Sequence, residues 1–77
     1  MLERRVDVGD TVVYVDLDDP ENKRQVKITI GSSNPEWGLV NVNTPIAQAL
    51  LGAKKGDIVE ALLPIGNKRL HILRVFK

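Results

Sequence analysis

The sequence predicts an α+β fold, in which a twisted antiparallel sheet of about five strands packs against one short helix. Several runs alternate apolar and polar residues, as half-buried strands do, and the clearest example is Lys23–Ile30. The stretch Pro45–Leu51 instead repeats apolar residues at three- and four-residue spacing, which indicates a helix. Strands grouped on both sides of a single helix favour this class over a parallel sheet with alternating helices.

The first strand is expected at Thr11–Leu17, directly after the turn residues Val8–Asp10. Apolar side chains occur at both odd and even positions of this run. A strand that is apolar on both faces is usually covered on both faces, so we place it inside the sheet.

A polar turn over Asp18–Asn22 should follow, with Pro20 at its centre. The next run, Lys23–Ile30, has an apolar set of side chains that should point inward and a polar set that should point outward. The two runs together predict an antiparallel hairpin. The inward side chains of the second run are Val26, Ile28 and Ile30.

The segment Gly31–Gly38 is a loop by composition. It contains Trp37, one of only three aromatic residues in the chain. Large aromatic residues also anchor binding partners, but a small core needs this one, so we expect Trp37 to pack on the core. A short strand, Leu39–Val42, then leads into the helix.

Both ends of the helix Pro45–Leu51 are marked in the sequence. The hydroxyl of Thr44 can cap the first turn, and Pro45 suits the first helical position because it has no N–H to leave unpaired. Gly52 can adopt the left-handed conformation that ends a helix. The stripe expected to face the core is Ile46, Ala49 and Leu50.

The last two strands are expected at Ile58–Leu63 and Lys68–Phe76. The apolar alternation of the second strand changes phase after Ile72, and such a change predicts a β-bulge. The sequences Gly9–Val12 and Gly56–Val59 are alike, which we interpret as two similar turns that lead into strands and not as a structural repeat.

The composition indicates a single small domain over residues 1–77, in which residues 1–7 are expected to be loosely ordered. The 11 basic and 10 acidic side chains leave a net charge of +1, which is too balanced to predict strong, direct nucleic-acid binding. The absence of cysteine excludes disulfides and thiolate zinc sites. No apolar run approaches the length of a membrane span, and the N-terminus lacks the apolar core of a signal peptide, so we expect a cytoplasmic protein. We also expect a monomer.

Four motifs resemble the C-terminal domain of the bacterial Gre transcription elongation factors (GreA/GreB-like). They are the strand opening Val8–Val12, the acidic turn Asp16–Asp18, the strand and proline turn Gly38–Ile46, and the helix end Leu50–Asp57. The four motifs occur in the same order and at matching spacing as in that family, and the resemblance extends over Val8–Phe76. The regulator of nucleoside diphosphate kinase, another Gre-like protein, is similar in the same motifs.

This resemblance implies an FKBP-like fold and a role in transcription elongation without an enzymatic activity or a cofactor. In Gre factors this domain docks on a coiled coil of the RNA polymerase β′ subunit at the rim of the secondary channel. A separate N-terminal coiled coil carries the acidic residues that hold the catalytic metal. Because the sequence begins only seven residues before Val8, we expect docking on bacterial RNA polymerase without transcript-cleavage activity.

The resemblance places the polymerase contact at the turn before the helix, which here consists of Asn43, Thr44, Pro45 and Ile46. Thr44 keeps the capping hydroxyl of the serine that the family has there. Asn43 replaces an aspartate, so a charge-assisted hydrogen bond to a basic partner becomes a neutral and weaker one. Taken without the resemblance to this family, the same residues indicate only a good helix cap.

No catalytic or metal-binding residues are predicted. His71 is the single histidine, and no cysteine is present to share a metal with it. The acidic run Asp16–Glu21 has Pro20 where a calcium loop needs a ligand, so we expect a solvated turn. Two other functions stay open: an adaptor domain cut from or fused to a larger protein, and an FKBP-like prolyl isomerase, for which the chain is poor in aromatic residues.

Overall fold

The computed structural model describes residues 4–31, 34 and 38–77, and it confirms the α+β class. Its elements in chain order are β1 (Thr11–Asp16), β2 (Asp19–Thr29), β3 (Leu39–Asn41), α1 (Pro45–Leu50), β4 (Ile58–Leu63) and β5 (Gly66–Phe76). Gly52 follows the helix at φ = +82°, in the left-handed region that the sequence predicted. Within the described residues, no helix has the length and apolar character needed to cross a membrane.

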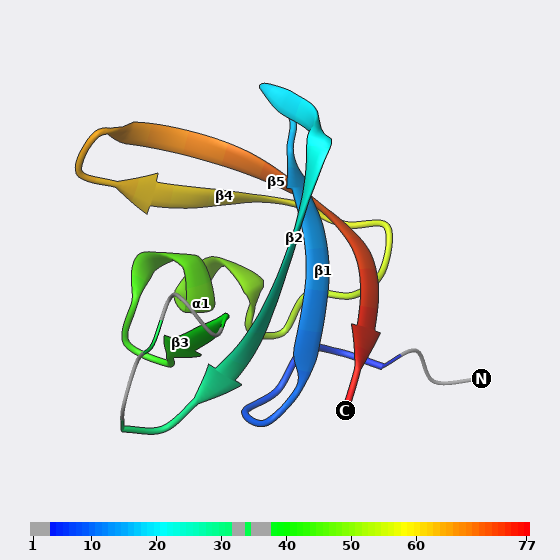
Figure 1. The fold of residues 1–77 in the computed structure, drawn as a ribbon, viewed down its shortest axis with the longest axis vertical. Coiled ribbons are helices and arrows are strands. Elements are labelled where there is room, and N and C mark those ends of the chain that lie inside the picture. The colour runs from blue at the N-terminus through cyan, green and yellow to red at the C-terminus, as the bar shows by residue number, and fades with distance from the viewer. Residues whose placement is uncertain (1–3, 32–33, 35–37) are drawn as a thin grey trace.

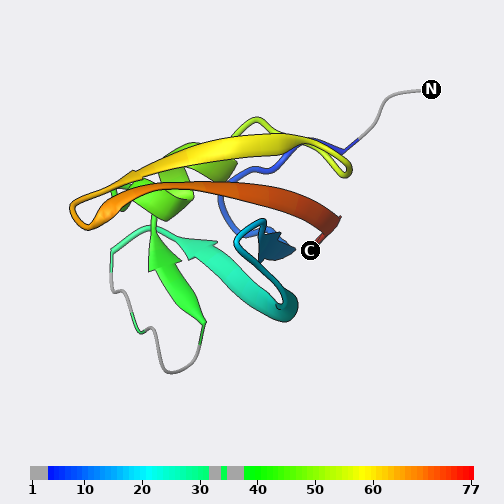
Figure 2. The same ribbon diagram turned by 90° about the horizontal axis from the view of Figure 1, so that it is seen from above.

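The five strands form one sheet in the order β3-β2-β1-β5-β4, which curls around the helix (Figure 1 and Figure 2). β1 lies in the middle and pairs antiparallel with both β2 and β5, which confirms its predicted interior place. β3 pairs parallel with β2, so the expected antiparallel sheet is corrected to a mixed one. Nine residues separate the two strands in the sequence, more than a two-residue hairpin needs, so the local sequence does not impose an antiparallel direction.

The hairpin of β1 and β2 turns earlier than the sequence predicted. β2 begins at Asp19, which pairs with Asp16 across the turn, so the predicted turn Asp18–Asn22 is wrong. Pro20 lies within the strand instead, at an exposed hairpin tip that tolerates a residue without an N–H.

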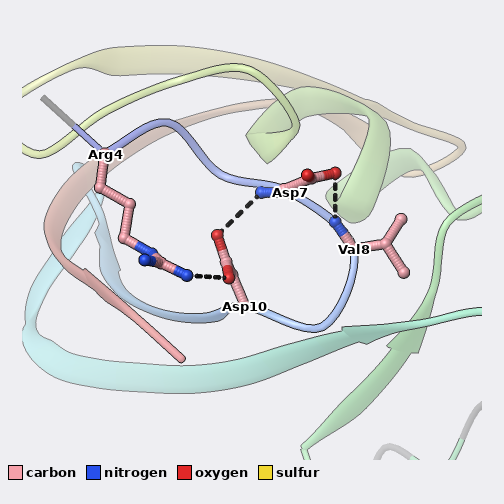
Figure 3. Close-up of polar contacts among 4 residues, drawn as sticks. All are labelled: Arg4, Asp7, Val8 and Asp10. Carbon is pink, nitrogen blue, oxygen red and sulfur yellow. Dashed lines mark hydrogen bonds and ion pairs between the residues drawn. The ribbon is translucent and has the colours of Figure 1, made fainter. Parts of the chain in front are cut away.

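The turn before β1 is closed by its own aspartate (Figure 3). The Asp10 amide donates to the Asp7 carbonyl (3.0 Å), and the Asp7 amide donates back to Oδ2 of Asp10 (3.0 Å). Gly9 occupies φ = +90°, a conformation that side chains rarely adopt. Because Gly9 donates to the carbonyl of Ile28, and Ile28 donates to the carbonyl of Asp10, the turn also aligns the end of β2.

The turn before β4 has the same geometry. The Asp57 amide donates to the Lys54 carbonyl (3.0 Å), and the Lys54 amide donates to Oδ2 of Asp57 (3.1 Å). Gly56 lies at φ = +92°, and its amide donates to the carbonyl of Ile72 on β5. The Ile72 amide donates to the carbonyl of Asp57, so Ile72 takes the place that Ile28 has in the first turn. The two similar turns predicted from the sequence are therefore confirmed.

β5 contains the bulge that its change of phase predicted. Val13 of β1 pairs with Arg74, whereas the next residue, Tyr14, pairs with Ile72. Leu73 is therefore an extra residue in the strand. The shift keeps Ile72 in the core, where it is fully buried.

The core lies between the inner face of the sheet and α1. Ile28 and Ile72 from the sheet and Leu50 from the helix are among its largest fully buried side chains. Ile30, which the alternation pointed inward, is 77% exposed. The prediction fails there because β2 ends at Thr29, and the pleat no longer directs the side chain.

Residues 4–7 pack against the turn before β1 and the segment that follows α1. Val6 is buried in the core, and its amide donates to the carbonyl of Ala53 (2.8 Å). Nη2 of Arg4 donates to Oδ1 of Asp10 at 2.6 Å (Figure 3). Of the residues expected to be loosely ordered, 4–7 are thus held by packing and an ion pair, and 1–3 lie outside the described part.

Asp10 is 2% exposed, and it is the buried charged residue of the described part. Burial raises its pKa, but the hydrogen bonds from Arg4 and the Asp7 amide and the positive charges of Arg4 and Lys77 outweigh burial, so the pKa of Asp10 lies below its ordinary value. The ionised carboxylate therefore stabilises the folded state. This contribution is complete above the pKa of the unfolded chain, about 4, and is lost as the pH falls through the lower folded pKa.

We expect Asp10→Asn to lower the free energy of unfolding at neutral pH by about 1.5 kcal/mol, the usual size for a hydrogen bond to a charged group. The variant should also lose less stability than the wild type as the pH falls below about 4, because it has no carboxylate to protonate at this site. Urea titrations at neutral and acidic pH measure both effects.

The matched control is Asp57→Asn, which alters the equivalent turn, whose aspartate makes no ion pair with a described residue. At neutral pH this variant should lose less stability than Asp10→Asn, because it removes no ion pair. If the two variants lose equal stability, the ion pair with Arg4 does not stabilise the fold.

Candidate functional site

Thr44 fixes the turn that precedes α1. Its Oγ1 accepts a hydrogen bond from the Ala47 amide (3.3 Å) and donates one to the Asn41 carbonyl (2.8 Å). Pro45 occupies the first turn of the helix. The predicted cap and proline position are confirmed, and together they hold the exposed start of the helix in one conformation.

Asn41 is a second organiser of this turn, and the sequence analysis missed it. Its Oδ1 accepts from the Asn43 amide (2.8 Å), and its Nδ2 donates to the carbonyl of Gly31. One side chain thus ties the turn to the segment that leaves β2. The available signal was the residue type, because asparagine readily closes such turns through its side chain.

Asn43 and Pro45 border an open hollow between α1 and the edge strand β4. The hollow has a volume of about 370 Å³, and its lining consists of Asn43, Pro45, Gln48, Ala49, Glu60 and Leu62. Leu62 is 63% exposed, so the hollow has an apolar side chain open to solvent beside the carboxylate of Glu60. Neither Glu60 nor Leu62 was predicted, because only the packing of β4 along α1 brings them to this place.

The side chain of Ile46 lies in a different hollow from those of Asn43 and Pro45. It is half-buried and lines a different hollow, between the two hairpins, together with Tyr14 and Leu63. The four residues predicted as a contact are therefore divided among three positions. Asn43 and Pro45 lie at the rim of the β4 hollow, Thr44 is the cap, and Ile46 faces the second hollow.

The fully buried face of α1 keeps one member of the predicted stripe, Leu50, and adds Ala47, which was not predicted. Ala47 and Leu50 are fully buried, whereas Ile46 and Ala49 are half-buried. The cap and the proline fix where the helix begins, and this start turns positions 47 and 50 toward the sheet. Ala49 faces the β4 hollow instead.

The hollow between the hairpins is lined by both polar and apolar side chains. Tyr14 is the one aromatic residue in its described lining. Burial raises the pKa of Tyr14, and the neighbouring charge of Arg24, which acts in the opposite direction, does not cancel this effect. The phenol is therefore neutral at physiological pH.

The acidic run of the β1–β2 hairpin is engaged in contacts within the hairpin and with β5. Oδ1 of Asp16 accepts from the Asp18 amide (2.8 Å), and Nζ of Lys68 lies 3.8 and 3.9 Å from these two carboxylates. Within residues 4–31, 34 and 38–77, no three His, Cys, Asp or Glu side chains are grouped so that they could hold a metal. Trp37, expected to pack on the core, lies outside the described residues.

Known proteins similar to this chain are transcription elongation factors. Residues 2–77 match the family described as "Transcription elongation factor, GreA/GreB, C-term". The chain is 43% identical over 68 residues to transcription elongation factor GreA of Sulfurovum sp. (strain NBC37-1), which covers 88% of this chain and 42% of that protein. It is 42% identical over 74 residues to GreA of Helicobacter hepaticus, which covers 94% of this chain and 44% of that protein. The chain spans less than half the length of these curated relatives.

Solved structures share the fold. The GreA factor homolog 1 (Gfh1) of Thermus thermophilus superposes with a TM-score of 0.79 at 18% identity, over 97% of this chain and 50% of that one. The GreA/GreB factor of Nitrosomonas europaea gives a TM-score of 0.76 at 20% identity, over 100% of this chain and 64% of that one. At these identities the likeness shows the fold alone.

Thr44→Ala should lower the free energy of unfolding by about 1 kcal/mol, because the Ala47 amide loses its capping acceptor. Thr44→Ser keeps the hydroxyl and should be nearly neutral, which makes it the matched control. Urea titration measures both variants. Equal stability of the alanine variant and the wild type would show that the cap contributes nothing to stability.

Proposed function

This chain belongs to the family of GreA/GreB transcription elongation factor C-terminal domains, and from that premise we propose that it docks on bacterial RNA polymerase. The proposed partner is the β′ coiled coil at the rim of the secondary channel, as the resemblance to Gre factors implies. The docking surface is the β4 hollow with the turn that borders it, and it consists of Asn43, Pro45, Ala49, Glu60 and Leu62.

The rigid turn beside an exposed apolar side chain is the observation that carries this proposal. Asn41 and Thr44 hold the backbone of the turn before any partner arrives, so binding does not have to order a loop. Pro45 and Leu62 then offer an apolar contact on opposite sides of the hollow. A surface of this size belongs to the small interface class, and we expect micromolar or weaker affinity.

Glu60 supplies a negative charge to this surface. The family has an aspartate where this chain has Asn43, and the loss of that carboxylate weakens a contact with a basic partner residue. Glu60 lines the same hollow as Asn43. We therefore assign the pairing with a cation of the partner to Glu60.

The domain by itself should dock without stimulating transcript cleavage. In Gre factors the acidic residues that hold the catalytic metal belong to a separate N-terminal coiled coil. Of the other two residues of the turn, Thr44 supports the surface because it caps the helix, whereas Ile46 lines the second hollow. An adaptor role within a larger protein remains the alternative, since the chain spans less than half of its relatives.

Titration of the ¹⁵N-labelled domain with a β′ coiled-coil fragment should shift the amides of the docking surface. Glu60→Gln and Leu62→Ala should each weaken binding several-fold, and Pro45→Ala should weaken it as well. Asn43→Asp should tighten binding, because it adds the charge that the family has.

Ile65→Ala is the matched control for the apolar contact, since Ile65 is 88% exposed but does not line the hollow. This variant should bind as the wild type does. Shifts that are confined to β5, or absent at millimolar partner, would contradict the proposed surface.

The domain should also show no prolyl isomerase activity, because its hairpin hollow contains a single aromatic side chain, Tyr14, in its described lining. A peptide isomerisation assay, with an authentic FKBP as positive control, tests this expectation. Turnover above background that disappears in Tyr14→Leu would reveal an activity that the proposed docking role does not include.

A further inference from the structure

The face of the sheet turned away from α1 is not covered by any described element (Figure 2). On β1 this open face carries Thr11 and Val13, which are half-buried, and Val15, which is 6% exposed; they alternate with the core residues Val12 and Tyr14. Residues paired across neighbouring strands point to the same side of a sheet. The register therefore decides which side chains of β2 and β5 join this face.

Cations lie on both sides of β1 on this face. From β2, Lys27 pairs with Thr11 and Lys23 pairs with Val15. From β5, Arg74 pairs with Val13. Arg69 belongs to the same face, two positions before His71, which also pairs with Val15. We call Lys23, Lys27, Arg69 and Arg74 the open-face cations, and all four are exposed.

The open-face cations make no ion pair with any described carboxylate. Most of the described acidic side chains lie elsewhere, for example Asp10 in the buried turn and Asp16 at the hairpin tip, paired with Lys68. Glu21 and Glu60 are exceptions at the margins of the face. Glu60 lies opposite Arg69 on the edge strand, where it also lines the β4 hollow of the docking surface. The net charge of +1 therefore averages over a surface with a local positive excess.

Between the cations the floor is apolar and partly aromatic. Val13 and Phe76 are half-buried, and the guanidinium of Arg74 lies 4.8 Å from the centre of the Phe76 ring. The two cation rows belong to strands on either side of β1, so they are about 10 Å apart. Cations that flank an apolar floor with an aromatic ring fit a chain that has phosphates along its backbone and flat bases.

We propose that the open face binds single-stranded nucleic acid, with phosphates at the open-face cations and a base against Phe76. An acidic protein segment would use the cations but not the ring. A duplex has its bases stacked inside and would likewise leave the ring without a partner. The open-face cations are not part of the docking surface, so this proposal and the docking proposal can fail separately.

Fluorescence anisotropy of labelled oligo(U) and oligo(dT), titrated with the domain at several salt concentrations, tests the proposal. Four phosphate contacts predict a slope of about −2.8 for log K against log salt concentration, and Lys23→Gln/Lys27→Gln should reduce it to about −1.4. Phe76→Leu should weaken binding about tenfold without changing the slope, because stacking is lost while the charges remain. RNA and DNA should bind alike, since the contacts go to phosphates and base faces.

The matched control is Arg24→Gln/Lys55→Gln, which removes the same charge from places outside the open face. Arg24 neighbours Lys23 on β2 but lines the hairpin hollow on the other side of the sheet. This control should keep the wild-type slope. The proposal is overturned if the control loses as much as the test variant, if polyglutamate of equal charge competes equally well, if a duplex binds more tightly, or if no binding occurs at low salt.

Discussion

One carboxylate, almost fully withdrawn from water, connects the parts of this domain that meet at its base. Asp10 accepts hydrogen bonds from Arg4 and from the Asp7 amide, and its own carbonyl accepts from Ile28. A buried charge without partners is strongly unfavourable, so the turn and the arginine are fixed together. The same segment inserts Val6 into the core, where it contacts the chain that leaves the helix through Ala53. Residues 4–7 thereby hold both the start of β1, through Asp10, and the segment after α1, through Ala53.

The candidate docking surface depends on contacts that are distant in sequence. Thr44 can cap α1 without help, but the hollow exists only because β4 runs beside the helix. The position of β4 follows in turn from the Gly56 turn, which ties its start to Ile72 on β5. A change in that turn should therefore displace β4 and, with it, Leu62.

Features that depend on a few neighbouring residues could be predicted from the sequence. The cap at Thr44, the two glycine–aspartate turns and the bulge after Ile72 are of this kind, because local sterics and alternation decide them. The direction of β3, the clamp by Asn41 and the contribution of Glu60 were not predicted, since each requires a partner from another part of the chain. The distribution of charge was not predicted for a related reason: the net charge counts side chains but not the faces on which the strand register places them.

The strand order has a consequence for how the chain is made. β1, the first strand to be synthesised, lies between β2 and β5, and β5 is the last strand. On the ribosome the hairpin of β1 and β2 can form early, but one edge of β1 stays without a partner until β5 has been synthesised. The core cannot close before β5 is available, and the long sequence separation of this pair makes its formation slow. The nascent chain thus exposes an unpaired central strand, the kind of surface that chaperones bind and that aggregates recruit.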